Sequence, residues 1–328
     1  MESSIWNAYP PIDEGIIKVK QILTKELSVK NPTITQKIQE YIDAPGKYLR
    51  AGLCLMMNQL NEEEISDEIY LRSAAIEAFH LATLIHDDVI DHSSTRRGIV
   101  TMHEEYSNKT AIYAGDYLLA VAGRLLKQSL PDTDHQSYPF LERLIEHILV
   151  GELNQLTNKY QLDMSIYDYL RQIRGKTALL FAAATFAGYY RSDHSYRQNK
   201  HAFYVGQNIG MAFQLMDDVI DLNSSLALSG KPSLQDVQNG IYTAPVLYAI
   251  NENDDIAHML KEHLSQPWQE EELNLLLSMI EQTSGLQATA ELTQRYTKKA
   301  HYYLSKLSQS PQAQVIHQLC DELILRVR

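Results

Sequence analysis

Three aspartates, Asp87, Asp88 and Asp91, follow an apolar run and carry the most specific chemistry in the sequence. Positions i and i+4 lie on one face of a helix, so we expect Asp87 and Asp91 to point the same way, with Asp88 on the flank. Neighbouring carboxylates repel one another unless a cation lies among them. Magnesium meets that need, because it prefers one or two carboxylates together with phosphate oxygens and water.

The same pentad, DDVID, occurs again as Asp217, Asp218 and Asp221, after a second apolar run. A single DDVID is more simply explained as an acidic helix end that water solvates. Two identical pentads, each closing an apolar helical run, are not explained in that way. If both faced one cavity, its six carboxylates would require several cations and a polyanion, such as a diphosphate bound through magnesium.

Further motifs surround the two pentads. Together they resemble the trans-isoprenyl diphosphate synthases, the polyprenyl synthetase family, and within it the bacterial medium- and long-chain (heptaprenyl-type) members. The resemblance covers nearly the whole chain. The motifs that carry it, in sequence order, are GKYLR at 46–50, His80, LIHDDVID at 84–91, TRRG at 95–98, AGD at 114–116, GELNQL at 151–156, GKTALLF at 175–181, FQLMDDVID at 213–221 and GKP at 230–232.

The resemblance implies an enzyme, a magnesium-dependent prenyltransferase. It would join isopentenyl diphosphate head to tail to an allylic diphosphate, farnesyl or geranylgeranyl. The allylic diphosphate departs, the double bond of isopentenyl diphosphate attacks the allylic cation, and a proton is lost. The protein must assist the leaving group, exclude water and align both substrates. No protein nucleophile is needed, and the sequence shows no Ser-His-Asp or Cys-His signature.

The metal ligands also follow from the resemblance. Asp87 and Asp91 would bind two magnesium ions and Asp217 another, about three per active site, which would spread the charge of the leaving group. Asp88, Asp218 and Asp221 would orient coordinated waters around them.

The resemblance assigns cationic side chains to each diphosphate, and arginine forks and lysine point charges suit phosphate oxygens. Thr177 and Gln214 would place oxygen dipoles near the developing cation, and Phe213 would pack on the isopentenyl tail. The diphosphate ligands would be Lys47, Arg50, His80 and Arg97 for isopentenyl diphosphate, and Arg96, Lys176 and Lys231 for the allylic diphosphate.

Two positions depart from the family pattern. Pro45 stands where the family usually has a glycine, which stiffens that turn. Ile241 stands where many members have a lysine that reaches the allylic diphosphate. We expect the missing lysine to weaken allylic binding or to make it more dependent on magnesium, without abolishing activity.

Product length is expected to depend on the residues before Asp87, because in the family the product grows along a tunnel beneath the first pentad. Short-chain members carry an aromatic residue four or five positions upstream, where this chain has Thr83 and Ala82. Phe79, one turn deeper, is either the tunnel floor or ordinary core. Since a growing chain stops at volume it cannot displace, the open positions favour a linear all-trans product of roughly six to eight isoprene units, for a quinone side chain.

Several alternatives stay open from the sequence alone. Two alternatives from the same family are a shorter-chain farnesyl or geranylgeranyl diphosphate synthase and the catalytic subunit of a two-component heptaprenyl diphosphate synthase. Terpene cyclases carry an Asn/Ser/Glu motif in place of the second pentad, which is intact here. Regulatory subunits generally show eroded aspartate motifs, so intact pentads disfavour that reading too.

Apolar residues recur with helical spacing from Ile12 to the C-terminal region, and strand alternation never persists. We therefore predict an all-α fold, with residues 1–328 forming a single large helical bundle around a central cavity. The net charge of −12 argues against a nucleic-acid partner. Cys54 and Cys320 resemble buried thiols of a reducing compartment. With no signal-peptide pattern and no transmembrane segment, we expect a cytoplasmic protein. We also expect a homodimer, with a heteromeric partner subunit as the alternative, whose product is delivered to the membrane.

Overall fold

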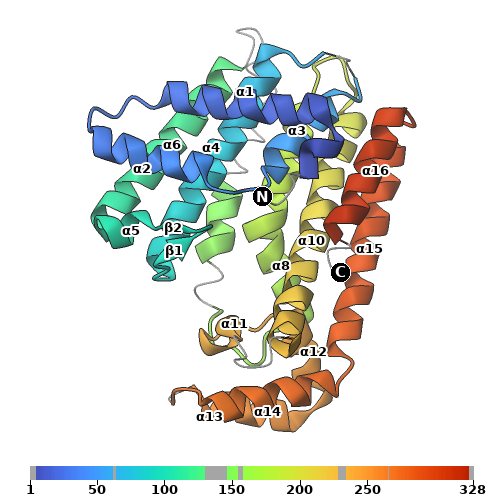
Figure 1. Cartoon of the computed structure of the whole chain (residues 1–328). Coiled ribbons are helices and arrows are strands. Elements are labelled where there is room, and N and C mark those ends of the chain that lie inside the picture. The colour runs from blue at the N-terminus through green and yellow to red at the C-terminus, as the bar shows by residue number, and fades with distance from the viewer. Residues whose placement is uncertain are drawn as a thin grey trace. The chain divides into compact units, whose positions relative to one another are not determined.

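The structure is a computed structural model that describes residues 5–61, 64–129, 146–153, 158–227, 234–264 and 266–324. Those residues are almost entirely helical, which confirms the all-α prediction (Figure 1). Residues 146–153 are also helical. The labelled elements are η1 (Ile5–Ala8), α1 (Pro10–Glu26), α2 (Pro32–Asp43), α3 (Leu49–Asn58), α4 (Asp67–Ile90), β1 (Thr95–Arg96), β2 (Ile99–Val100), α5 (Met102–Glu105), α6 (Asn108–Gln128), α8 (Ile166–Ile173), η2 (Arg174–Ala178), α9 (Leu179–Tyr189), α10 (Tyr196–Ala227), α11 (Gln235–Gln238), α12 (Ala244–Glu252), α13 (Asp254–Glu262), α14 (Glu270–Glu281), α15 (Gly285–Ser305) and α16 (Pro311–Ile324).

The chain groups into two compact units, each described here by itself. The first consists of Met1–Pro139 and Ala183–Phe203, and the second of Phe140–Ala182 and Tyr204–Arg328. Because this grouping does not test whether the chain forms one bundle around a central cavity, the single-domain expectation stays a prediction.

Helix α4 is the centre of the first unit and packs against α1, α3 and α6. Most of its residues are buried, as expected of a helix that is apolar on nearly every side. Small side chains such as Ala78 and Ala82 let neighbouring helices approach closely. Gly115 of α6 shows this best, because a Cβ there would lie 2.2 Å from Nε2 of His86. The AGD motif therefore fixes α6 against the helix that carries the first pentad.

The end of α4 positions the first pentad. The helix ends at Ile90, and the backbone N–H of Asp91 still donates to the carbonyl of Asp87 at 2.8 Å, which keeps these two residues one turn apart. A short hairpin, β1–β2, follows it, and Arg97 and Gly98 form its two-residue turn. Both have positive φ, 50° and 83°, the combination that a type I′ turn requires.

Helix α3 begins inside the GKYLR motif. Its first residue is Leu49, because Tyr48 takes a left-handed backbone with φ of 47°. The indole of Trp6 donates to the carbonyl of Lys47 at 2.5 Å. The Tyr48 hydroxyl donates to the carbonyl of Ile42 at 2.5 Å. These bonds hold Lys47 in a defined loop ahead of the helix.

Helix α10 carries the second pentad in the second unit, where its buried residues join a core with α8, α12 and α14. Two glycines bring backbones together in this unit. A Cβ on Gly151 would lie 2.8 Å from the Cα of Gly175, and a Cβ on Gly210 would lie 2.6 Å from the Cα of Ala178. The glycines of GELNQL and GKTALLF therefore pack directly on each other.

No helix in the described part of the chain is both long enough and apolar enough to cross a membrane.

Candidate active site

The first pentad separates into one buried and two accessible carboxylates. Asp88 is 1% exposed and accepts hydrogen bonds from the Tyr41 hydroxyl, at 3.0 Å, and from Nε of Arg96, at 2.5 Å. Burial raises the pKa of Asp88, against the lowering effect of Arg96 and Tyr41. Asp87 is partly exposed and Asp91 exposed. Asp88 thus anchors the helix end, while Asp87 and Asp91 remain accessible.

The second pentad repeats this division within its own unit. Asp218 is 5% exposed and accepts from the hydroxyl of Tyr169 and, at 3.2 Å, from the amide of Gln214. Burial raises the pKa of Asp218 to about 7, although both hydrogen bonds act to lower it. Asp217 is partly exposed and Asp221 exposed. In both pentads the middle aspartate is bound by a tyrosine, and the outer two are accessible.

The accessible pairs fit magnesium rather than a closed metal site. Among the described residues, no three acidic, histidine or cysteine side chains converge so that they could hold a metal ion by themselves. Zinc in a structural site would require such a convergence, whereas magnesium takes one or two carboxylates and completes its shell with phosphates and water. Hard carboxylate oxygens one helical turn apart are suitable donors for magnesium.

The predicted ligands of isopentenyl diphosphate lie in the first unit, and we call Lys47, Arg50, His80 and Arg97 the basic cluster. Nη1 of Arg50 lies 3.2 Å from Nε2 of His80. Because a guanidinium can only donate, Nε2 of His80 must accept, which leaves its proton on Nδ1. Burial, followed by the charges of Arg50 and the other nearby arginines, holds the pKa of His80 well below its usual value. Without a bound diphosphate the neutral imidazole of His80 is therefore favoured. The predicted role of His80 as a ligand of isopentenyl diphosphate stays a prediction.

The guanidinium of Arg97 lies against the Pro45–Gly46 turn. A Cβ on Gly46 would come within 2.4 Å of Nη1 of Arg97, so the glycine makes room for this contact. Arg97 reaches this turn from the β1–β2 hairpin turn, where its backbone has a positive φ. Lys47 is exposed beside this glycine.

Adjacent arginines of TRRG have different surroundings. Arg96 donates from Nε to the buried Asp88, whereas Arg97 lies against Gly46. The predicted contact of Arg96 with the allylic diphosphate would therefore use its Nη atoms. Asp88 fixes the direction of that side chain.

Lys176 and Thr177 lie in η2, a single turn of π-helix. Such turns are frequent at functional sites, and no local pattern in the sequence indicates this one. Nζ of Lys176 lies 3.5 Å from the carboxylate of Glu152 in GELNQL. The Thr177 hydroxyl donates to Oε1 of Gln214 at 2.8 Å. With Gln214 bonded to Asp218, these side chains form a hydrogen-bonded chain from Thr177 to the second pentad.

Phe213 packs against Phe181, with ring centroids 5.4 Å apart. In the first unit, Phe79 is 3% and Ala82 0% exposed, while Thr83 is only partly buried. The Thr83 hydroxyl donates to the carbonyl of His80 at 2.8 Å. The proposed roles of these four residues in substrate packing and product length stay predictions.

Lys231 and the rest of the GKP motif lie outside the described residues, as do residues 154–156 of GELNQL. The predicted contact of Lys231 with the allylic diphosphate therefore stays a prediction. Ile241 is partly buried, and its backbone N–H donates to the carbonyl of Asp236 at 2.7 Å.

Sequence reasoning missed three residues of these sites. Tyr41 and Tyr169 hold the two middle aspartates, but they precede them by 47 and 49 positions, so no local pattern reveals the pairs. Glu77 is 2% exposed on α4 and carries a buried carboxylate. An acidic residue inside an apolar helical run, one turn before His80, was a detectable signal.

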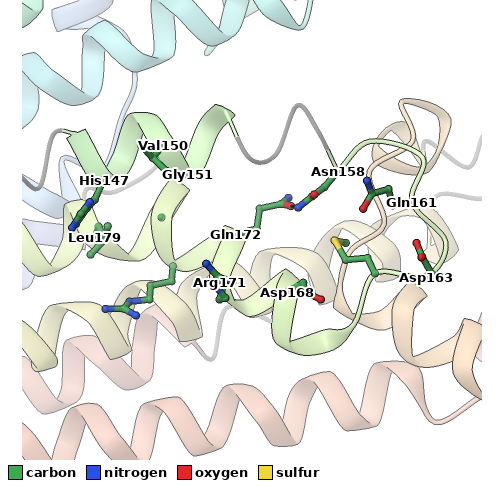
Figure 2. A pocket seen from close by; sticks show the side chains of 13 residues that line it. His147, Val150, Gly151, Asn158, Gln161, Asp163, Asp168, Arg171, Gln172 and Leu179 are labelled. Carbon is green, nitrogen blue, oxygen red and sulfur yellow. Dashed lines mark hydrogen bonds between the residues drawn. The ribbon is translucent and has the colours of Figure 1, made fainter.

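The second unit also contains a pocket of about 590 Å³ (Figure 2). Helix 146–153, α8 and η2 contribute its walls, and Asn158 donates to Gln172 at 3.1 Å within it. Figure 2 shows both basic and acidic side chains around it, including His147, Arg171, Asp163 and Asp168. The pocket shares Gly151 with GELNQL and Gly175 with GKTALLF, but its lining contains neither Lys176 nor an aspartate of the pentads.

Comparison with known proteins bears on the family of this chain. The model of the family described as polyprenyl synthetase matches residues 31–280. Heptaprenyl diphosphate synthase component 2 of Bacillus subtilis is 29% identical over 92% of this chain and 84% of its own. The crystal structure of geranylgeranyl pyrophosphate synthase from Lactobacillus brevis is 30% identical, with a TM-score of 0.90 over 98% of this chain and 99% of that one. The Caulobacter crescentus polyprenyl synthase, solved with calcium and isoprenyl diphosphate, is 28% identical, with a TM-score of 0.88 over 99% of both chains.

Proposed function

Because this chain belongs to the polyprenyl synthetase family and is a prenyltransferase, we propose that it elongates farnesyl or geranylgeranyl diphosphate with isopentenyl diphosphate. The product is a linear all-trans diphosphate of roughly six to eight isoprene units, a length at which the side chains bounding the tunnel stop growth. The observation that carries this proposal is the division within both pentads: a buried, tyrosine-bound middle aspartate between two accessible ones.

The accessible aspartates hold divalent cations in this proposal. Structures of relatives contain calcium with isoprenyl diphosphate, which supports divalent metal binding in the family. Bound magnesium, about three ions per active site, would neutralise charge on the departing diphosphate. Asp87, Asp91 and Asp217 supply carboxylate oxygens to it. Asp88 and Asp218 hold the helices that carry the pentads in place through their buried hydrogen bonds.

The remaining side chains bind and orient the substrates. Arg50, Arg97 and Lys47 supply positive charge to the diphosphate of isopentenyl diphosphate, and the neutral His80 can donate from Nδ1 while Nε2 accepts from Arg50. Lys176 binds the allylic diphosphate. Thr177 and Gln214 are held to each other, so their oxygen dipoles keep a fixed direction toward the developing positive charge.

A second arrangement is supported by a specific relative. The Bacillus subtilis protein is component 2 of its synthase, so this chain could equally be the catalytic subunit of a two-component enzyme. In that case addition of the partner subunit would raise the rate of elongation. As a single-component enzyme, the chain would instead be a homodimer that is active alone.

The basic cluster is tested by Arg50→Ala. This variant should raise the KM for isopentenyl diphosphate about tenfold to a hundredfold, because losing a hydrogen bond to a charged group costs about 1.5–3 kcal/mol. The KM for the allylic substrate should change far less, since metal ions contribute to its binding. Steady-state kinetics with each substrate varied in turn measures both values. Equal weakening of both substrates would refute the assignment of the cluster to isopentenyl diphosphate.

A further inference from the structure

Glu77 carries a buried acid on α4. It is 2% exposed, and its Oε2 atom is buried without a hydrogen-bond partner among the described residues. A buried carboxylate that lacks compensation costs several kcal/mol, so it persists only where nearby charges offset that cost. Glu77 lies on α4 three residues before His80, which places both side chains on the same face of the helix.

Positive charges from three different elements act on this carboxylate. They are Arg50 of α3, Arg97 of the hairpin turn and Lys20 of α1. Nζ of Lys20 lies 4.6 Å from the centre of the Tyr48 ring. Burial, and after it the charge of Glu77, raises the pKa of the Tyr48 hydroxyl. The buried positions described for α6, which packs on α4, carry no titratable group. Glu77 is therefore a buried acid in the electrostatic field of Arg50, Arg97 and Lys20.

The balance of charge around Glu77 depends on what the arginines bind. Burial raises the pKa of Glu77, and the three cations only partly oppose that effect. A diphosphate bound to Arg50 and Arg97 would engage the same charges and add a strong negative field beside the carboxylate. Both effects disfavour the ionised form of Glu77 and increase its affinity for a proton.

We propose that Glu77 is the counter-charge of the basic cluster in the free enzyme and takes up a proton from solvent when the diphosphate of isopentenyl diphosphate binds there. The inference rests on the proposed function of that cluster. The step is a proton transfer: the buffer acid loses a proton and becomes its conjugate base, and the carboxylate gains an O–H bond and becomes a neutral carboxylic acid. Since binding consumes a proton, this contribution makes affinity rise as pH falls between the bound and free pKa values of Glu77.

The test is a calorimetric titration of isopentenyl diphosphate into the full chain without magnesium. It is run in buffers of equal pH but different ionisation enthalpy, at a pH where the diphosphate is fully ionised. The difference between buffers gives the number of protons bound. The wild type should take up a measurable fraction of a proton, and Glu77→Gln should still bind but lose that uptake. Glu77→Asp, which keeps the acid, should retain it.

A matched control is Asp43→Asn, which removes an exposed carboxylate that also acts on Tyr48. This variant should keep the uptake. Absence of uptake in the wild type, or uptake that persists in Glu77→Gln, would overturn the proposal. Uptake lost instead in His80→Gln would assign the proton to the imidazole and also overturn it. If Arg50→Ala left the affinity for isopentenyl diphosphate unchanged, the assignment of the cluster itself would be at fault.

Discussion

Asp87→Ala and Asp217→Ala should each lower kcat at least about a hundredfold while leaving the helical fold intact. A Lewis-acidic cation contributes several kcal/mol to stabilising the leaving group, and each 1.36 kcal/mol corresponds to a tenfold change in rate. Both residues are partly exposed and belong to the accessible side of their pentads. Circular dichroism would establish that the fold is retained, and steady-state assays across a range of magnesium concentrations would measure the loss.

The control for these variants is Asp254→Ala, which removes an exposed aspartate from the first turn of α13. It should retain the rate of the wild type. Near-normal turnover of Asp87→Ala or Asp217→Ala at saturating magnesium would show that these carboxylates do not hold the cations on which the reaction depends.

The second large effect concerns product length and α4. Thr83→Phe should shift the products to farnesyl or geranylgeranyl diphosphate. Thr83 lies one turn before Asp87 and is only partly buried, so a bulky ring there would project into the path of the growing chain. Because protein interiors are close-packed, the end of the growing chain cannot displace this ring. Chromatography of the dephosphorylated products would measure the shift.

Thr83→Val and Phe79→Ala test separate claims about how α4 limits product length. Thr83→Val keeps the volume of the side chain and should keep the product length of the wild type. Phe79→Ala should lengthen the product if Phe79 is the floor of the tunnel. Ala82→Phe is harder to interpret, because Ala82 is fully buried and overpacking there lowers the stability of the fold by about 1–3 kcal/mol. Unchanged products from Thr83→Phe would mean that α4 does not line the tunnel.

Much of the fold was predictable because it depends on local patterns. The apolar periodicity of α4 and the low content of glycine and proline indicated helices, and the structure is almost entirely helical where it is described. The exact ends of the helices were harder to predict from the sequence. Tyr48 adopts a left-handed backbone held by a bond to Ile42, and nothing in the letters GKYLR reports that partner.

The sequence singled out the residues of the proposed sites, but it did not reveal their surroundings. The doubled pentad identified six aspartates, yet the sequence could not show that Asp88 and Asp218 are buried against tyrosines far away in the chain. In the same way, it could not show that Nη1 of Arg50 lies beside Nε2 of His80. These contacts join residues far apart in the sequence, so they leave no local pattern.

The most direct test of the proposed activity uses the purified chain alone with magnesium, isopentenyl diphosphate and farnesyl diphosphate. We expect isopentenyl diphosphate to be consumed, with one diphosphate released for each unit added, and a linear product of roughly six to eight isoprene units, the length at which packed side chains stop growth. Release of diphosphate from the allylic substrate without consumption of isopentenyl diphosphate would contradict head-to-tail elongation.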